Sequence, residues 1–167
     1  MKYLLRVVIL LILPLAAAAQ SPAVVKKQAQ TVANALLMGD YKTVLDHTYP
    51  KAVEMGGGKT KMLQMMTTGL NQMRSEGFKF EKITVGTPGK FYKAGTELHC
   101  LLPQTIVMKT KQGRFSGSSN LLAVSGDNGK SWSFLDLNGG SIKAIDQIFP
   151  KFNHSLVIPQ PQQPVKL

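Results

Sequence analysis

The sequence is poor in cysteine, in acidic residues and in long apolar runs. Its 167 residues include one cysteine, Cys100, so no internal disulfide can form and an apolar core must stabilise the fold. The apolar run from Val7 to Leu15 is too short to cross a bilayer. Arginine is scarce and no aromatic residues alternate with the lysines, so a nucleic-acid partner is not expected.

The spacings that metal and cofactor sites require are also missing. The three histidines, His47, His99 and His154, show no metal-ligand spacing. Cys100 and His99 are neighbours on an expected strand, so their side chains point to opposite faces and cannot act as a pair. The glycines at 56–58 lack the first glycine and the preceding strand of a phosphate-binding loop. We therefore expect neither a metal nor a cofactor.

Residues 1–19 have the pattern of a cleavable signal peptide. Lys2 and Arg6 precede the short apolar run, and Ala17 to Ala19 supply the small residues of a cleavage site. No cysteine follows the run for lipid attachment, so we expect a periplasmic or secreted chain that begins at Gln20. The formal net charge of +11 stays strongly positive without Lys2 and Arg6, which favours an anionic envelope surface as a partner, although the lysines are scattered.

Helical spacing predicts three helices in the first half of the chain. The first starts at Ser21, whose hydroxyl is expected to cap it, and ends at Gly39. Asp40 caps a short second helix, which must end before Pro50. The third follows the glycines at 56–58 and ends at Gly77. Its apolar stripe consists of Met62, Leu63, Met66, Leu70 and Met73. Flexible thioethers suit either a core or an adaptable pocket.

From Phe78 onwards, apolar residues alternate at period two and predict an antiparallel meander of about four strands. A change of phase near residues 81–82 predicts a β-bulge. In the run from Thr96 to Met108, His99 and Cys100 lie on opposite faces, and Pro103 indicates an edge or a bend.

The C-terminal part begins with a short helix. Ser141 is its expected cap, and its apolar residues end at Phe149, before Pro150. Residues 159–167 are polar and rich in proline, which predicts an extended or disordered tail.

The clearest local signal is the turn between Ser125 and Trp132. Asp127, Asn128 and Gly129 separate two apolar runs, and Asn-Gly tolerates the positive φ that a tight hairpin needs. The residues match the pattern S-x-D-x-G-x-[ST]-W and resemble the Asp-box hairpins of sialidase-type propellers. In those hairpins the aspartate accepts backbone hydrogen bonds and the tryptophan packs beneath it. One copy cannot form a propeller, which requires repeated blades.

The order of elements resembles the nuclear-transport-factor-2-like superfamily, in which a curved sheet wraps around helices in a cone. Several segments are also similar to a group of small exported proteins of Bacteroidetes-type bacteria. They are Asp46 to Pro50, Gly57-Gly58, Val85-Gly86, Leu102 to Gln104, Gly129 to Asp136 and Phe149-Pro150. The superfamily includes isomerases, dehydratases, polyketide cyclases and non-catalytic binders, so this resemblance implies a fold and a pocket without choosing a function.

We therefore expect an α+β fold in which N-terminal helices pack on a curved antiparallel sheet of about four strands, followed by a short C-terminal helix. Residues 1–19 form the signal peptide, residues 20–158 a single domain and residues 159–167 the tail. A single domain of this length is large enough to bury an apolar core.

The leading functional hypothesis is non-enzymatic binding of a small apolar or amphipathic molecule, or of a protein partner. A homodimer through the sheet face is one form of the latter. The candidate ligand-binding residues are His47, Tyr49, Met62, Met66, His99 and Trp132. The alternative is a cofactor-independent isomerase or dehydratase with Asp46 or His47 as base and Tyr49 as proton donor, which the resemblance implies because enzymatic members of that superfamily place such groups inside the cone.

Overall fold

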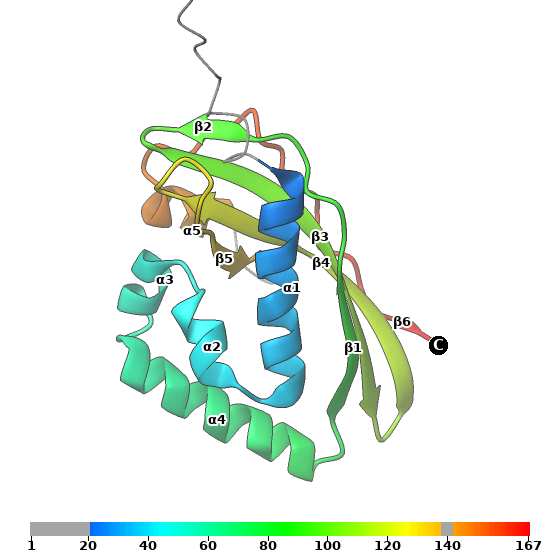
Figure 1. Ribbon diagram of the computed structural model, residues 1–167. Coiled ribbons are helices and arrows are strands. Elements are labelled where there is room, and N and C mark those ends of the chain that lie inside the picture. Colours follow the sequence, from blue (N-terminus) through cyan, green and yellow to red (C-terminus); the bar gives the residue numbers. More distant parts are fainter. Residues whose placement is uncertain (1–20, 138–141) are drawn as a thin grey trace, which may run out of the picture.

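The structure, a computed structural model, describes residues 21–137 and 142–167. N-terminal helices pack on one face of an antiparallel sheet, and a short helix lies on the other (Figure 1). This confirms the predicted α+β class. The predicted signal peptide, residues 1–19, and the predicted helix cap Ser141 lie outside the described residues. None of the helices in the described part of the chain is long and apolar enough to span a membrane.

Turn residues set the ends of the first two helices. Helix α1 (Pro22–Met38) ends at Gly39, which adopts a φ of 78°. Asp40 caps α2 (Tyr41–Asp46), because its carboxylate accepts a hydrogen bond from the Thr43 N–H at 3.1 Å. The Ser21 hydroxyl makes no capping bond, which corrects the sequence prediction. Pro22, which fixes a helical φ, occupies the first turn instead.

The next helices surround the glycine loop. Helix α3 (Pro50–Met55) starts with proline at its first position and was not predicted from the sequence. Helix α4 (Lys59–Ser75) starts directly after the glycines and stops before Gly77, which has a φ of 92°, as predicted. In Figure 1, α1 lies against the sheet, whereas α2, α3 and α4 form a separate group on the same side.

The sheet contains six strands in its described residues: β1 (Lys79–Val85), β2 (Tyr92–Ala94), β3 (Glu97–Thr110), β4 (Gly113–Ser125), β5 (Ser133–Asp136) and β6 (Val165–Lys166). The main order is β1-β3-β4-β5, and the short strands β2 and β6 pair with β3 and β4. The register shifts between Phe80 and Lys82, which confirms the predicted bulge. Pro103 faces the loop between β1 and β2, where its carbonyl accepts a hydrogen bond from Gly86 at 2.7 Å, so its missing N–H interrupts no ladder.

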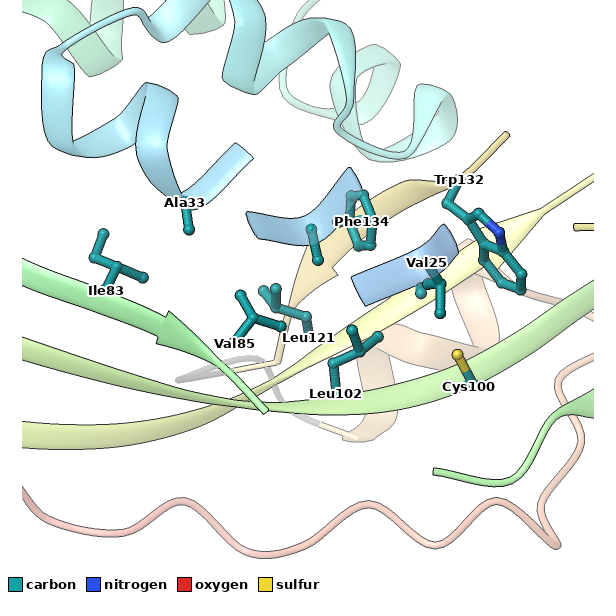
Figure 2. Packing of buried hydrophobic residues seen from close by; sticks show 11 residues of the cluster. Val25, Ala33, Ile83, Val85, Cys100, Leu102, Leu121, Trp132 and Phe134 are labelled. Atoms are coloured by element: carbon teal, nitrogen blue, oxygen red, sulfur yellow. The ribbon is translucent and has the colours of Figure 1, made fainter. Parts of the chain in front are cut away.

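Each face of the sheet carries its own apolar cluster. The cluster on the helix face contains Val25, Ala29, Ala33, Ile83, Val85, Cys100, Leu102, Leu121, Ala123, Trp132 and Phe134 (Figure 2). The cluster on the outer face contains Leu122, Val124, Leu137, Ile145, Phe149 and Leu156, part of it from α5 (Ile142–Ile148). Burial raises the pKa of the Cys100 thiol to about 12. The thiol therefore stays protonated at neutral pH and acts as a small core residue.

The hairpin between β4 and β5 has the predicted turn. Asn128 and Gly129 adopt φ values of 62° and 93°. The Asp127 carboxylate accepts hydrogen bonds from the backbone N–H groups of Lys130 and Ser131 at 3.0 and 2.9 Å. The Trp132 backbone N–H donates to the side-chain oxygen of Gln28 at 2.9 Å, which ties the hairpin to α1. The Gln28 amide also donates to the Lys130 carbonyl at 3.1 Å. Local sequence thus fixes the turn, and two long-range bonds to Gln28 position it.

The C-terminal tail, expected to be extended or disordered, pairs with the sheet at its end. Val165 and Lys166 lie opposite Ser116 and Phe115 of β4, and the Leu167 N–H donates to the Arg114 carbonyl at 2.9 Å. Residues 159–162 line a hollow on the outer face of β3 and β4. The pairing starts directly after Pro164, where N–H donors are available again.

Candidate functional site

Helix α4 has an apolar stripe that the rest of the protein only half covers. None of its residues is fully buried, and it packs on α2 and α3 instead of on the sheet (Figure 1). Met62 and Met66 are half-buried, whereas Met65, one residue away from the stripe, is 61% exposed. The helix is therefore the outer wall of a space rather than a core element.

This space is a cavity of about 260 Å³ between α4 and the sheet. Its walls are mostly apolar, with His47, Gln104 and Asp136 among the polar contributors. The full lining is Ala29, Val32, Ala33, Leu36, Val44, Leu45, His47, Thr48, Met62, Met66, Gln104, Leu121, Phe134, Leu135 and Asp136. An apolar hollow with few polar groups is the usual form of a small-molecule site.

Asp46 connects the end of α2 to the beginning of α4. Its carboxylate forms an ion pair with Lys42 at 2.7 Å and a second, close ion pair with Lys59. The lysines of both pairs are exposed, so each pair adds little stability. The pairs nevertheless show that Asp46 is engaged at the surface and that the C-terminal end of α2 lies beside the first turn of α4.

His47 follows Asp46 and lines the cavity. Its Nδ1 lies 3.0 Å from the Thr43 carbonyl oxygen. Because a carbonyl only accepts, Nδ1 carries the hydrogen and the lone pair of the neutral ring is on Nε2. Nε2 has no hydrogen-bond partner among the described residues. The imidazole thus has a fixed tautomer and a ring nitrogen available to a ligand.

The chain between α2 and α3 extends the edge of the sheet. The Phe134 N–H donates to the His47 carbonyl at 2.7 Å, and the Tyr49 N–H donates to the Phe134 carbonyl at 3.1 Å. These bonds form a parallel bridge between Thr48 and Phe134. The bridge places His47 and Thr48 at the cavity, while the Tyr49 ring reaches Phe149 of the outer-face cluster, with ring centroids 4.5 Å apart.

Tyr49, Glu97 and His99 form a hydrogen-bonded chain on the other side of the sheet. The Tyr49 hydroxyl donates to Glu97 Oε1, and His99 Nε2 lies 3.0 Å from Glu97 Oε2. His99 is 1% exposed and its ring packs against Phe149. Burial, followed by the bond to Glu97, raises the pKa of Tyr49 to about 12. These groups border a second hollow of about 220 Å³.

The predicted ligand-binding residues thus fall into three places. His47, Met62 and Met66 line one cavity. Tyr49 and His99 lie at the second hollow, and Trp132 is buried in the core. They do not form the one site that the sequence suggested, because the alternation along β3 turns His99 away from the helices.

The proposed catalytic set does not converge either. Asp46 is held in surface ion pairs, His47 faces the cavity and the Tyr49 hydroxyl is bonded to Glu97 on the outer side of the sheet. Sequence reasoning missed Glu97 and Gln104. Glu97 could have been found from strand alternation, since it shares a face with His99, whereas no local signal marks Gln104.

Comparison with known proteins gives no relative. No protein-family model, no curated protein and no solved structure matches this chain. No group of three or more His, Cys, Asp and Glu residues suited to a metal ion occurs within residues 21–137 and 142–167. Function must therefore be argued from the cavity beside α4 and from the hollow beside Tyr49 and His99.

Proposed function

We propose that the protein is an exported, non-enzymatic binding domain that holds a small apolar or amphipathic molecule between α4 and the sheet. The observation that supports this function is the apolar cavity of about 260 Å³ that His47, Met62 and Met66 line together. A closed apolar cavity of about 150 Å³ is already enough to bind a benzene-sized molecule. The cavity therefore suits a small ring system or a short acyl chain.

The polar residues favour a ligand with one polar group. His47 Nε2 is available, as described above. The Gln104 amide donates to Ser119 Oγ at 3.3 Å and to Asp136 Oδ2 at 3.4 Å, and both distances are long for hydrogen bonds. A hydroxyl or carbonyl of the ligand would improve on such bonds, because a buried polar group gains most from a well-placed partner.

The methionine wall supports an adaptable pocket. Met62 and Met66 belong to a helix that contacts α2 and α3 but has no buried anchor of its own. Unbranched thioether side chains can repack around ligands of different shape. The site would therefore accept a class of molecules rather than a single one.

The other hypotheses have less support. The enzyme hypothesis requires the Tyr49 hydroxyl beside Asp46 or His47, whereas this hydroxyl is bonded to Glu97 on the other side of the sheet. A partner bound through an open sheet face would have to displace α5 and the tail, which cover parts of the outer face.

The test combines native mass spectrometry with a fluorescent probe. Protein purified from its host compartment should retain a small molecule, and N-phenyl-1-naphthylamine should compete with it. Val32→Phe places a ring in the cavity and should weaken probe binding at least about tenfold, which corresponds to about 1.4 kcal/mol. Val157→Phe is the matched control, because Val157 is 78% exposed and does not line the cavity. Equal probe affinity in the two variants would refute the proposal.

A further inference from the structure

Three soft or borderline metal ligands line the same cavity: the sulfur-containing side chains of Met62 and Met66 and the imidazole of His47. Met62 and Met66 are four residues apart on α4, so they lie one above the other on one helix face. His47 follows α2 directly, and the Asp46–Lys59 ion pair holds this end of α2 beside the first turn of α4. Met62 is one helical turn beyond Lys59, so all three side chains start from neighbouring backbone.

The His47 ring has the arrangement of a metal-binding histidine. Such histidines usually donate the hydrogen of one ring nitrogen to a carbonyl or carboxylate and coordinate with the other nitrogen. The Nδ1 of His47 donates to the Thr43 carbonyl at 3.0 Å, and Nε2 has no partner within the described residues. The hydrogen bond to Thr43 fixes the ring before any ion binds.

A site with both thioethers requires the Met62 side chain to turn towards the cavity. The Met62 sulfur lies next to Gly56, where an added Cβ would be only 2.6 Å away from it. Three rotatable side-chain bonds allow the sulfur to turn into the cavity. Met66 is half-buried and lines the cavity one turn further along the helix.

We propose that Met62, Met66 and His47 bind a soft monovalent metal ion, Cu(I), with two thioether sulfurs and one imidazole nitrogen. Thioether ligands select Cu(I), and imidazole also binds copper, whereas Zn(II) prefers thiolate, imidazole and carboxylate in a tetrahedral arrangement. Cys100 does not line this cavity, so no thiolate is present for zinc. The Asp136 carboxylate does line it, and this carboxylate accepts hydrogen bonds from Gln104 and Ser119. All three ligands are neutral, and the single positive charge of Cu(I) costs less to bury than a divalent ion.

This inference uses the same cavity as the proposed function but does not depend on an apolar ligand. The test is anaerobic titration of the purified chain with Cu(I) in competition with bathocuproine disulfonate. We expect one Cu(I) per chain, no comparable binding of Zn(II), and an X-ray absorption spectrum with sulfur and nitrogen neighbours.

The variants exploit the other methionines of α4. The double change Met62→Leu and Met66→Leu preserves volume and should lower Cu(I) affinity at least about a hundredfold, and His47→Gln at least about tenfold. Met65→Leu with Met73→Leu is the control on the same helix, because both residues are exposed and neither lines the cavity. Circular dichroism checks that each variant folds.

The outcomes separate the two proposals. If the Met62 and Met66 double variant keeps wild-type Cu(I) affinity, or if the Met65 and Met73 control loses as much, the copper site is refuted. The leucine variant should still bind the naphthylamine probe, since leucine is apolar and of similar size. A chain that binds the probe but no Cu(I) refutes the copper site alone, and one that binds Cu(I) but no probe refutes the apolar-ligand function alone.

Discussion

At the scale of single residues, Asp127 stabilises the hairpin turn that the local sequence pattern predicts. Hydrogen bonds from the Ser131 hydroxyl and from nearby backbone N–H groups hold its pKa well below the ordinary value of 3.8. Asp127→Ala leaves the N–H groups of Lys130 and Ser131 without this acceptor, so we expect a loss of about 1 kcal/mol in the free energy of unfolding at pH 7. Urea denaturation measures the difference.

The pH dependence of this loss has a definite sign. Because the pKa is lower in the folded than in the unfolded state, the contribution of Asp127 is complete above about pH 4 and disappears as the pH falls further. Wild type and Asp127→Ala should therefore differ less at pH 3 than at pH 7. Glu54→Ala, which removes an exposed acid, serves as control. A difference between wild type and Asp127→Ala that grows on acidification would contradict the role of the carboxylate.

Residues whose role depends on close neighbours in the sequence could be predicted. The cap at Asp40, the stop at Gly39 and the turn at Asn128 and Gly129 each follow from backbone requirements within four residues. Gln104 could not be predicted, because its partner Ser119 comes from the neighbouring strand. From sequence alone, a polar residue on a strand is predicted to face solvent. Its burial becomes clear only when the elements that cover that face of the sheet are known.

At the scale of elements, the contacts of the connection between α2 and α3 depart furthest from the sequence prediction. The Tyr49 hydroxyl bond to Glu97 joins this connection to β3 across 48 positions of sequence. Tyr49→Phe removes the hydroxyl, keeps the ring against Phe149 and should cost about 1 kcal/mol. Tyr92→Phe is the control and should change stability by less than about 0.5 kcal/mol, because the Tyr92 hydroxyl makes no such bond within the described part of the chain. Equal effects of the two changes would exclude a role for the bond.

The alkaline behaviour of Tyr49 gives a second measurement. Its pKa is raised from 10.0 to about 12, so the neutral hydroxyl is favoured in the folded state. The stabilisation is complete below pH 10 and is lost as the pH rises towards 12. Absorbance titration should show a late ionisation in the wild type that is missing in Tyr49→Phe.

Helix α3 and the Thr48–Phe134 bridge could not be predicted from the sequence. A helix of six residues contains too few turns to show a periodic pattern. The bridge joins a loop to the edge of β5, and a pairing of this kind depends on where the two layers meet. The long elements α1, α4, β3 and β4 could be predicted from the sequence, because the periodic pattern of their apolar residues extends over many residues.

At the scale of the whole molecule, the candidate site was half predicted. The expectation of a space between the methionine helix and the sheet agrees with the cavity beside Met62 and Met66. The sequence prediction wrongly assigns residues from both faces of the sheet to one site. Tyr49 and His99 contribute to the outer side, which α5 covers, and only the folded arrangement separates the two sides.

The same arrangement predicts an uneven distribution of stability. Helix α1 and strands β3 and β4 carry fully buried residues, whereas α4 carries none and contains a glycine at position 69 with open space around it. Amide hydrogen exchange in α4 should therefore be faster than in β3 and β4, because a unit with little buried surface opens without global unfolding.

Gly69→Ala tests this distribution directly. Alanine lowers the entropic cost of the helix by about 1 kcal/mol and meets no neighbouring atom, so exchange in α4 should slow about fivefold while exchange in β3 and β4 stays the same. A bound apolar probe should also slow exchange in α4, since it fills the space behind Met62 and Met66. If Gly69→Ala instead slowed exchange equally in all elements, α4 would open only with the whole domain, and the movable wall that the binding site requires would not exist.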